Sequence, residues 1–191
     1  MSLAILLGSF DPIHRGHQRM VAEMRGRADV VRLLVPAAHF EKRIRFPRNA
    51  TLDQRVEMIR AVYPDGSGVE ARVSHEVLFV SLARRHPEAL FGMGRETLGK
   101  LLRSQRYFER LGLPWGDGEA RVLSRLIPRV VVFDRADGIS STRVRRVAGD
   151  LHAASASAAE WERGLGPLVA PPVTAYVRAL GLYSGRGAVG S

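Results

Sequence analysis

Short apolar runs alternate with helical segments along almost the whole chain, and this alternation restricts the fold more than any other feature. The clearest run, Asp29–Pro36, is rich in valine and leucine with little polar interruption. Runs of this kind are typical of strands in a parallel sheet whose two faces are both covered by helices. Strands that alternate with helices also favour right-handed crossover connections. The pattern predicts one α/β domain over residues 1–191, built on a parallel sheet flanked by helices.

Periodicity and turn residues give the bounds of the expected elements. Strands are predicted at Leu3–Gly8, Asp29–Pro36, Val69–Ser74, Ala89–Met93 and Val130–Phe133. Helices are predicted at Gly16–Arg25, Thr51–Tyr63, Phe79–Arg85 and Glu96–Leu111, and then at Thr142–Ala148 and Val173–Leu180 within a C-terminal helical segment of about residues 142–183. Loops are predicted at His39–Arg48 and Leu113–Gly118, and a flexible small-residue segment at Ala153–Ala159.

Composition restricts the class of protein. The chain has 191 residues, of which 46% are hydrophobic and 25% charged, as in globular proteins. It contains no cysteine, which excludes thiol catalysis, disulfides and cysteine-ligated zinc. The first apolar run, Leu3–Leu7, is too short for a signal peptide or a membrane span. We therefore expect a cytoplasmic protein with no membrane partner.

The formal net charge of +10 comes almost wholly from arginine, since Lys42 and Lys100 are the only lysines. The planar guanidinium suits phosphate recognition, so the charge is consistent with an anionic ligand. A solvated, arginine-rich surface explains the charge equally well. A nucleic-acid-binding module would also be basic, but no recognition motif accompanies the charge, so we do not expect nucleic acid as a partner. Homo-oligomer formation stays open.

The stretch Gly8–His17 has the order strand, tight glycine turn, two histidines, helix. Ser9 and Phe10 offer backbone N–H groups near the end of the strand, and Gly16 lets the backbone approach a ligand. His17 falls in the first helical turn, where free N–H groups and the helix dipole favour an anion. Two imidazoles there can donate hydrogen bonds to phosphate oxygens as charge builds in a transition state.

Two other interpretations of these histidines compete with phosphate binding. A histidine beside a strand is often only a structural hydrogen-bonding group. Histidines three residues apart can also share a metal ion, but no carboxylate-rich or histidine-rich segment completes such a site, so no protein-held metal is predicted.

A second polar motif, Ile139–Arg146, follows the predicted strand Val130–Phe133. Ser140, Ser141 and Thr142 precede a helix that carries Arg145 one turn in. Hydroxyls and N–H groups at a helix start, together with an arginine, can form a second phosphate-binding cradle. The same three hydroxyls would serve equally as ordinary N-caps. The phosphate-binding interpretation of this motif therefore depends on its combination with the histidine motif.

The patterns G-x-F-D-P-x-H-x-G-H and I-S-S-T-x-V-R together resemble the nucleotidylyltransferase superfamily, and within it the bacterial nicotinate-nucleotide adenylyltransferases. Pro36-Ala37-Ala38 with Lys42, the segment Asp53–Met58, Val132–Arg135 and Leu168–Tyr183 resemble further segments of that family. The resemblance implies a Rossmann-like fold, ATP as the donor with Mg²⁺, and a phosphorylated acceptor, first of all nicotinate or nicotinamide mononucleotide. The acceptor phosphate would attack the α-phosphorus in line and expel pyrophosphate without a covalent enzyme intermediate.

The resemblance also implies residue roles. His17 would contact the α-phosphate and His14 the triphosphate, while Lys42 and Arg145 would contact the leaving pyrophosphate. Ser140, Ser141 and Thr142 would bind the β- and γ-phosphates. The remaining nucleotide-binding residues expected are Gly8, Ser9, Phe10, Gly16 and Arg135.

The acceptor half departs from the family pattern. Glu76–Leu82 has lost most of the hydroxyls of the family's nicotinate pocket, and Gly92–Glu96 brings in an arginine. Arg95 is therefore expected to contact the acceptor, with Tyr107 as an aromatic platform. Another acceptor, such as pantetheine phosphate or a sugar phosphate, stays open, as do CTP as the donor and a catalytically silent nucleotide-binding protein. Gly94–Leu101 imitates a P-loop but lacks the Ser or Thr after Lys100.

Overall fold

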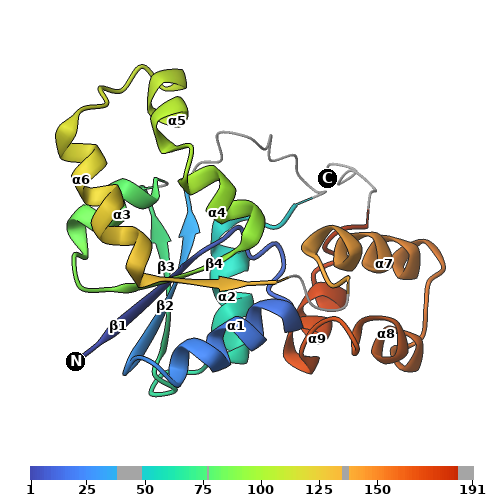
Figure 1. Cartoon of the computed structure of the whole chain (residues 1–191). Helices are drawn as coiled ribbons and strands as arrows, with labels where there is room; N and C mark the ends of the chain where they lie inside the picture. The colour runs from blue at the N-terminus through green and yellow to red at the C-terminus, as the bar shows by residue number, and fades with distance from the viewer. Residues whose placement is uncertain (38–48, 77, 135–137, 185–191) are drawn as a thin grey trace.

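The computed structural model describes residues 1–37, 49–76, 78–134 and 138–184. Its strands form one parallel sheet in the order β3-β2-β1-β4-β5 (Figure 1). The strands are β1 (Leu3–Leu7), β2 (Val30–Pro36), β3 (Val69–Ser74), β4 (Leu90–Gly94) and β5 (Val130–Phe133). Each lies within one residue of its predicted bounds. The α/β class and the Rossmann-like parallel sheet are confirmed.

The helices follow the strands in the expected alternation and then gather after β5. They are α1 (Arg15–Arg25), α2 (Leu52–Val62), α3 (Phe79–Arg85), α4 (Arg95–Leu101), α5 (Ser104–Arg110), α6 (Asp117–Leu126), the 3₁₀ helix η1 (Ile127–Arg129), α7 (Ser141–Ala153), α8 (Ala158–Leu165) and α9 (Pro171–Ala179). Figure 1 shows α7, α8 and α9 together at one side of the sheet. Among the described residues, none of the helices is both long and apolar enough to cross a membrane.

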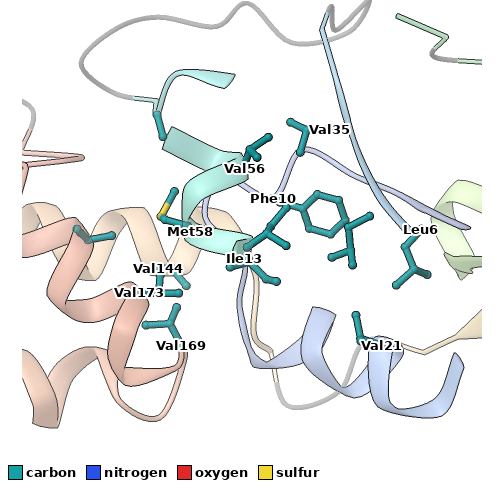
Figure 2. Packing of buried hydrophobic residues seen from close by; sticks show 14 of the residues in the cluster. Leu6, Phe10, Ile13, Val21, Val35, Val56, Met58, Val144, Val169 and Val173 are labelled. Carbon is teal, nitrogen blue, oxygen red and sulfur yellow. The ribbon is translucent and has the colours of Figure 1, made fainter. Parts of the chain in front are cut away.

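The sheet is covered on both faces because successive side chains of β1 point in opposite directions. Ala4 and Leu6 join a core with the helices α1, α2, α7, α8 and α9. Ile5 joins the core on the other face, which includes Leu82 of α3 and Leu126 of α6. Ile13, in the loop after β1, is fully buried in the first core, and Figure 2 shows it near Met58 and Val144. The loop between β1 and α1 is thus anchored by packing.

One predicted helix, Glu96–Leu111, is wrong as a single element. The chain forms α4 and α5 with a break at Leu102 and Arg103, where Arg103 has φ −106° and ψ 23°. The hydroxyl of Ser104 donates a hydrogen bond to the Leu101 carbonyl oxygen, and such local side-chain bonds compete with the helical pattern. The Arg103 Nε also donates to the Gly99 carbonyl oxygen, at 2.8 Å.

The predicted small-residue segment Ala153–Ala159 is shorter in the structure, because both of its ends are helical. Helix α7 continues to Ala153, and α8 begins at Ala158. Ser157 and Glu160 form a reciprocal capping box, in which the Glu160 carboxylate accepts from the Ser157 N–H at 2.6 Å. Trp161 and Leu165 of α8 are buried in the core. Helix α6 was not predicted either, although the Glu119 carboxylate caps it by accepting from the Gly116 N–H at 3.1 Å.

The strand order places the loop after β1 at a functional position. β1 lies between β2 and β4, so the chain winds outward in both directions from this strand. In parallel sheets of this kind, a crevice forms where the winding direction changes, at the carboxyl ends of the strands. The histidine motif follows β1 directly and therefore lies at this crevice.

Candidate active site

A cavity of about 520 Å³ opens at the carboxyl ends of β1, β4 and β5. It brings together both polar motifs, which are more than a hundred residues apart in the chain. The predicted site residues that line it are Gly8, Ser9, Phe10, His14, Gly16 and His17 from the first motif, Ser140, Ser141, Thr142 and Arg145 from the second, and Tyr107 from α5. The structure therefore brings these predicted residues together around one cavity.

The two histidines form a closed pair at the start of α1. The His17 backbone N–H donates to His14 Nδ1 at 3.4 Å, and the His14 backbone N–H donates to His17 Nδ1 at 3.3 Å. The imidazole rings stack with their centroids 3.7 Å apart. The ring of Phe10 packs edge-on against His17 at 4.8 Å. The ring of His17 is thus held by both His14 and Phe10, and the ring of His14 by its stacking on His17.

This arrangement keeps both imidazoles neutral. Burial lowers the pKa of His14 from its ordinary value of 6.5 to about 4. Burial and the neighbouring His14 hold the pKa of His17 well below its ordinary value. Because each Nδ1 accepts a backbone N–H, the single ring proton lies on Nε2. The pair can therefore offer two Nε2–H donors to an anion in the cavity.

The pH dependence of the pair has a definite sign. Below the ordinary imidazole pKa of 6.5 the unfolded chain takes up protons, while folded His14 stays neutral until about pH 4. The unfolded state binds more protons in this window, so the pair's contribution to stability is complete above pH 6.5 and decreases as the pH falls.

We expect ¹⁵N NMR of the ligand-free protein at pH 6 to show both imidazoles as neutral Nε2–H tautomers. The urea-unfolded chain, with mostly protonated rings, is the control. An imidazolium at either position in the folded protein would contradict the assignment.

Gly16 has a more specific role than backbone approach to a ligand. A Cβ atom at this position would lie 3.1 Å from Cε1 and Nδ1 of His14. The absence of a side chain at Gly16 therefore makes room for the imidazole of His14. Phe10 has φ 42°, in the left-handed region that non-glycine residues seldom adopt, and its side chain is buried. Such backbone strain is frequent at ligand-binding loops.

Backbone donors surround the histidine pair. The N–H groups of Ser9, Phe10 and Gly16 have no acceptor within the described parts of the chain. The Arg15 N–H instead donates to the Leu168 carbonyl oxygen at 2.8 Å, which fixes the start of α1 to the C-terminal helices. Unsatisfied donors at a helix N-terminus, together with the helix dipole, favour an anion.

The start of α7 supplies a second set of donors to the same cavity. Ser140 is the N-cap, and its hydroxyl accepts from the Arg143 N–H at 3.2 Å. The Ser141 hydroxyl donates to the Pro12 carbonyl oxygen at 3.2 Å, which joins the two motifs directly. The capping role and the cavity position therefore coexist, and the first turn of α7 faces the same space as the histidines.

Arg145 is held at the cavity by Asp11. Its Nη1 donates to the Asp11 backbone oxygen at 2.6 Å and lies 3.5 Å from the carboxylate Oδ2. The carboxylate is buried and also accepts from the Tyr183 hydroxyl at 2.9 Å and the Ala50 N–H at 3.0 Å. Buried Arg55 approaches it to 3.7 Å. Burial and the Asp11 charge raise the pKa of Tyr183 well above its ordinary value. Sequence reasoning did not predict this network.

The part of the cavity lining that comes from β4 and the helices α3, α4 and α5 is largely apolar. Leu78, Phe79, Met93, Leu101 and Phe108 line it beside Tyr107. Lys100 also lines it, although the sequence analysis assigned this residue only to a false P-loop pattern. Helix α4 begins at Arg95, directly after β4, so Gly94–Leu101 does not form a phosphate-binding loop.

Three predicted site residues are not among the described residues that line the cavity. Lys42 and Arg135 lie outside the described residues. Arg95 does not line the cavity. Its guanidinium pairs with Asp134 at 2.8 Å, and both side chains are largely exposed. This ion pair raises the pKa of Arg95 and lowers the pKa of Asp134.

The chain is similar to known proteins in sequence and in fold. Residues 5–147 match the cytidylyltransferase-like family. A phosphopantetheine adenylyltransferase of Pseudarthrobacter chlorophenolicus is 30% identical over 154 residues, which cover 78% of this chain and 82% of the relative. One from Arthrobacter sp. strain FB24 is 31% identical over 109 residues, covering 57% of this chain and 61% of that relative. A nicotinic acid mononucleotide adenylyltransferase of Plasmodium falciparum, complexed with NaAD, aligns over 97% of this chain and 98% of its own with a TM-score of 0.63. Its 15% identity shows a shared fold alone.

Proposed function

This chain belongs to the cytidylyltransferase-like family of nucleotidylyltransferases, and we propose that it transfers AMP from ATP to a phosphorylated acceptor and releases pyrophosphate. The observation that carries this proposal is the convergence of two neutral imidazoles and the first turn of α7 on one cavity. The site offers many hydrogen-bond donors to an anion. Among the described lining residues Asp134 is the one carboxylate, and it is paired with Arg95.

The proposed reaction needs positioning and charge neutralisation more than a protein nucleophile. An oxygen of the acceptor phosphate forms a bond to the α-phosphorus, the bond from this phosphorus to the bridging oxygen of the β-phosphate breaks, and that oxygen leaves with pyrophosphate. His17 would donate from Nε2 to the α-phosphate and His14 to the triphosphate. The first turn of α7 and Arg145 would hold the β- and γ-phosphates, with Lys42 and Arg135 as further contacts predicted from the sequence.

Mg²⁺ would enter the site with the triphosphate as part of the substrate. Within the described residues no three His, Asp or Glu side chains gather to hold a metal ion by themselves. The donor set fits a magnesium-bound triphosphate, because Arg145 and the N–H groups can contact oxygens that the ion leaves available. Bound Mg²⁺ would neutralise charge on the leaving pyrophosphate.

We rank nicotinate or nicotinamide mononucleotide first as the acceptor. The reason is that the long C-terminal segment Leu168–Tyr183 resembles the nicotinate-nucleotide adenylyltransferases. Phosphopantetheine is the second candidate. The relatives that are 30–31% identical are phosphopantetheine adenylyltransferases. The segment Glu76–Leu82, from which Leu78, Phe79 and Val80 line the cavity, also departs from the hydroxyl-rich pattern of the nicotinate family. A cytoplasmic location is a further expectation that rests on the sequence, and homo-oligomer formation stays open.

A screen of pyrophosphate release tests the proposal. ATP, CTP, GTP and UTP are each combined with Mg²⁺ and with nicotinate mononucleotide, nicotinamide mononucleotide, phosphopantetheine or ribose 5-phosphate. We expect release with ATP and a pyridine mononucleotide. Release only with phosphopantetheine would replace the first acceptor by the second. Release only with CTP would overturn the donor. ATP binding without release for every acceptor would identify a silent nucleotide-binding protein.

The same screen decides the predicted role of Arg95. In Arg95→Ala, a selective rise in the KM for nicotinate mononucleotide would place the guanidinium at the acceptor despite its pairing with Asp134. An unchanged KM would remove Arg95 from the acceptor site, in agreement with its position outside the cavity lining.

A further inference from the structure

A second hollow of about 490 Å³ runs along α4 and α5 beside the cavity. Cationic side chains dominate it. We call it the arginine groove; its lining includes Arg103, Arg106 and Arg110 together with Lys100, Tyr107 and Glu96. Lys100 and Tyr107 line both the groove and the cavity. The groove therefore continues from the apolar side of the cavity, away from the histidine pair.

The three arginines lie on one face. Arg103 precedes α5, and Arg106 and Arg110 follow at spacings of three and four residues, which places neighbouring side chains over one another on a helix. Arg103 is further fixed, because its Nε donates to the Gly99 carbonyl oxygen of α4 at 2.8 Å. All three side chains are exposed. Like charges at this spacing repel one another, so the face favours an anion that can lie between them.

These arginines differ from many others on the surface. Exposed arginines elsewhere find a carboxylate, as in the pairs Arg27–Glu23, Arg60–Glu57 and Arg84–Glu119. Within the described part of the chain, no carboxylate forms an ion pair with Arg103, Arg106 or Arg110. An arginine fork binds phosphate oxygens in a bidentate manner, and several forks along one groove suit a multiply charged anion.

The position of the groove relates it to the acceptor. The donors for the triphosphate and for the reacting phosphate lie at His14, His17 and the start of α7, whereas the groove begins beyond Tyr107. An acceptor that places its phosphate at the histidines and its body along the apolar wall would reach the groove with its far end. We propose that the arginine groove binds a second phosphoryl group at the far end of an elongated acceptor, so that an acceptor with a phosphate at each end binds more tightly than a singly phosphorylated one such as nicotinate mononucleotide or phosphopantetheine. This inference rests on the proposed function.

Direct binding measurements test the inference without knowledge of the natural acceptor. The cavity's nucleotide side is saturated with Mg²⁺ and the non-hydrolysable α,β-methylene analogue of ATP. Straight-chain alkanediol bisphosphates of increasing length are then titrated beside the monophosphates of the same length. We expect an optimal length at which the bisphosphate binds roughly tenfold more tightly or better, because the second phosphate binds at a high effective concentration. A bisphosphate that is never tighter than its monophosphate would overturn the proposal.

A matched pair of double variants locates the effect. Arg106→Gln with Arg110→Gln should abolish the gain of the bisphosphate and leave the affinities for the monophosphate and the ATP analogue unchanged. Arg121→Gln with Arg125→Gln removes the same charge from exposed positions of α6 and should leave the gain intact. Equal losses in both double variants would show a general charge effect and contradict a defined groove.

Two further outcomes separate this proposal from its alternatives. If the groove variants weaken binding of a single-stranded RNA oligonucleotide and leave the bisphosphate gain intact, the face is a nucleic-acid surface and the proposal is wrong. The titration is also repeated without nucleotide, so that binding of the bisphosphate to the groove is measured even if ATP is not the donor. Failure of the proposed function would appear as absent pyrophosphate release, whereas failure of the groove would appear as an absent bisphosphate gain.

Discussion

Replacement of His17 by alanine should lower kcat by roughly 10²-fold or more, the usual cost of losing a donor that meets charge in the transition state. The neutral Nε2–H of His17 is the donor proposed for the α-phosphate, and the substitution removes it. Single-turnover measurement is preferable, because it separates the chemical step from product release. Unchanged turnover in a folded variant would exclude the proposed role.

His17 has two functions that amide substitutions can separate. Its Nδ1 accepts the His14 backbone N–H at 3.3 Å and so closes the start of α1, while its Nε2 carries the proposed donor. In His17→Asn the amide oxygen can occupy the position of Nδ1, so stability should be kept while kcat falls. In His17→Gln the amide nitrogen can reach the position of Nε2, so part of kcat should return. His75→Ala changes an exposed histidine outside the cavity and serves as the control.

The fold was predictable because its signal is local and repeated. The strand Val69–Ser74, the helix Phe79–Arg85 and the strand Val130–Phe133 begin and end at the predicted residues. The position of the site followed from topology, since the loop after the first strand of such a sheet lies at the crevice. The failures were also local. Ser157 and Glu160 formed a capping signal that a run of small residues obscured, and the hydroxyl of Ser104 disturbed an otherwise continuous helix.

The arrangement of side chains within the site was harder to predict. Gly94–Leu101 matched a phosphate-loop pattern, and only the three-dimensional structure places Lys100 of that stretch at the cavity wall. Arg95 belongs to the divergent acceptor segment, but its rotamer is set by Asp134, thirty-nine residues away in the chain. Asp11, Arg55 and Tyr183 meet from three distant segments, and no periodicity or spacing relates them. Pairings of this kind depend on the packed fold.

Among the substitutions proposed for this protein, replacement of Asp11 by alanine should produce the largest loss in the free energy of unfolding. The carboxylate is buried, as is the Arg55 guanidinium that it faces at 3.7 Å. Removing one member of a buried ion pair leaves an uncompensated charge, which costs about 3–5 kcal/mol of the free energy of unfolding. The substitution also leaves the Tyr183 hydroxyl and the Ala50 N–H without their acceptor.

Urea unfolding of matched variants measures this cost. Glu23→Ala is the control, because it breaks the exposed Arg27–Glu23 pair, and surface pairs contribute only about 0–1 kcal/mol. A double-mutant cycle of Asp11→Asn with Arg55→Gln then isolates the coupling, which should exceed that of the surface pair. The Asp11 carboxylate oxygen Oδ2 also lies 3.5 Å from Arg145 Nη1, and the amide oxygen of Asp11→Asn can keep a polar contact there that Asp11→Ala removes, so Asp11→Asn should lose less activity. A loss below about 1 kcal/mol in Asp11→Ala would mean that the buried network contributes no more than the surface pair.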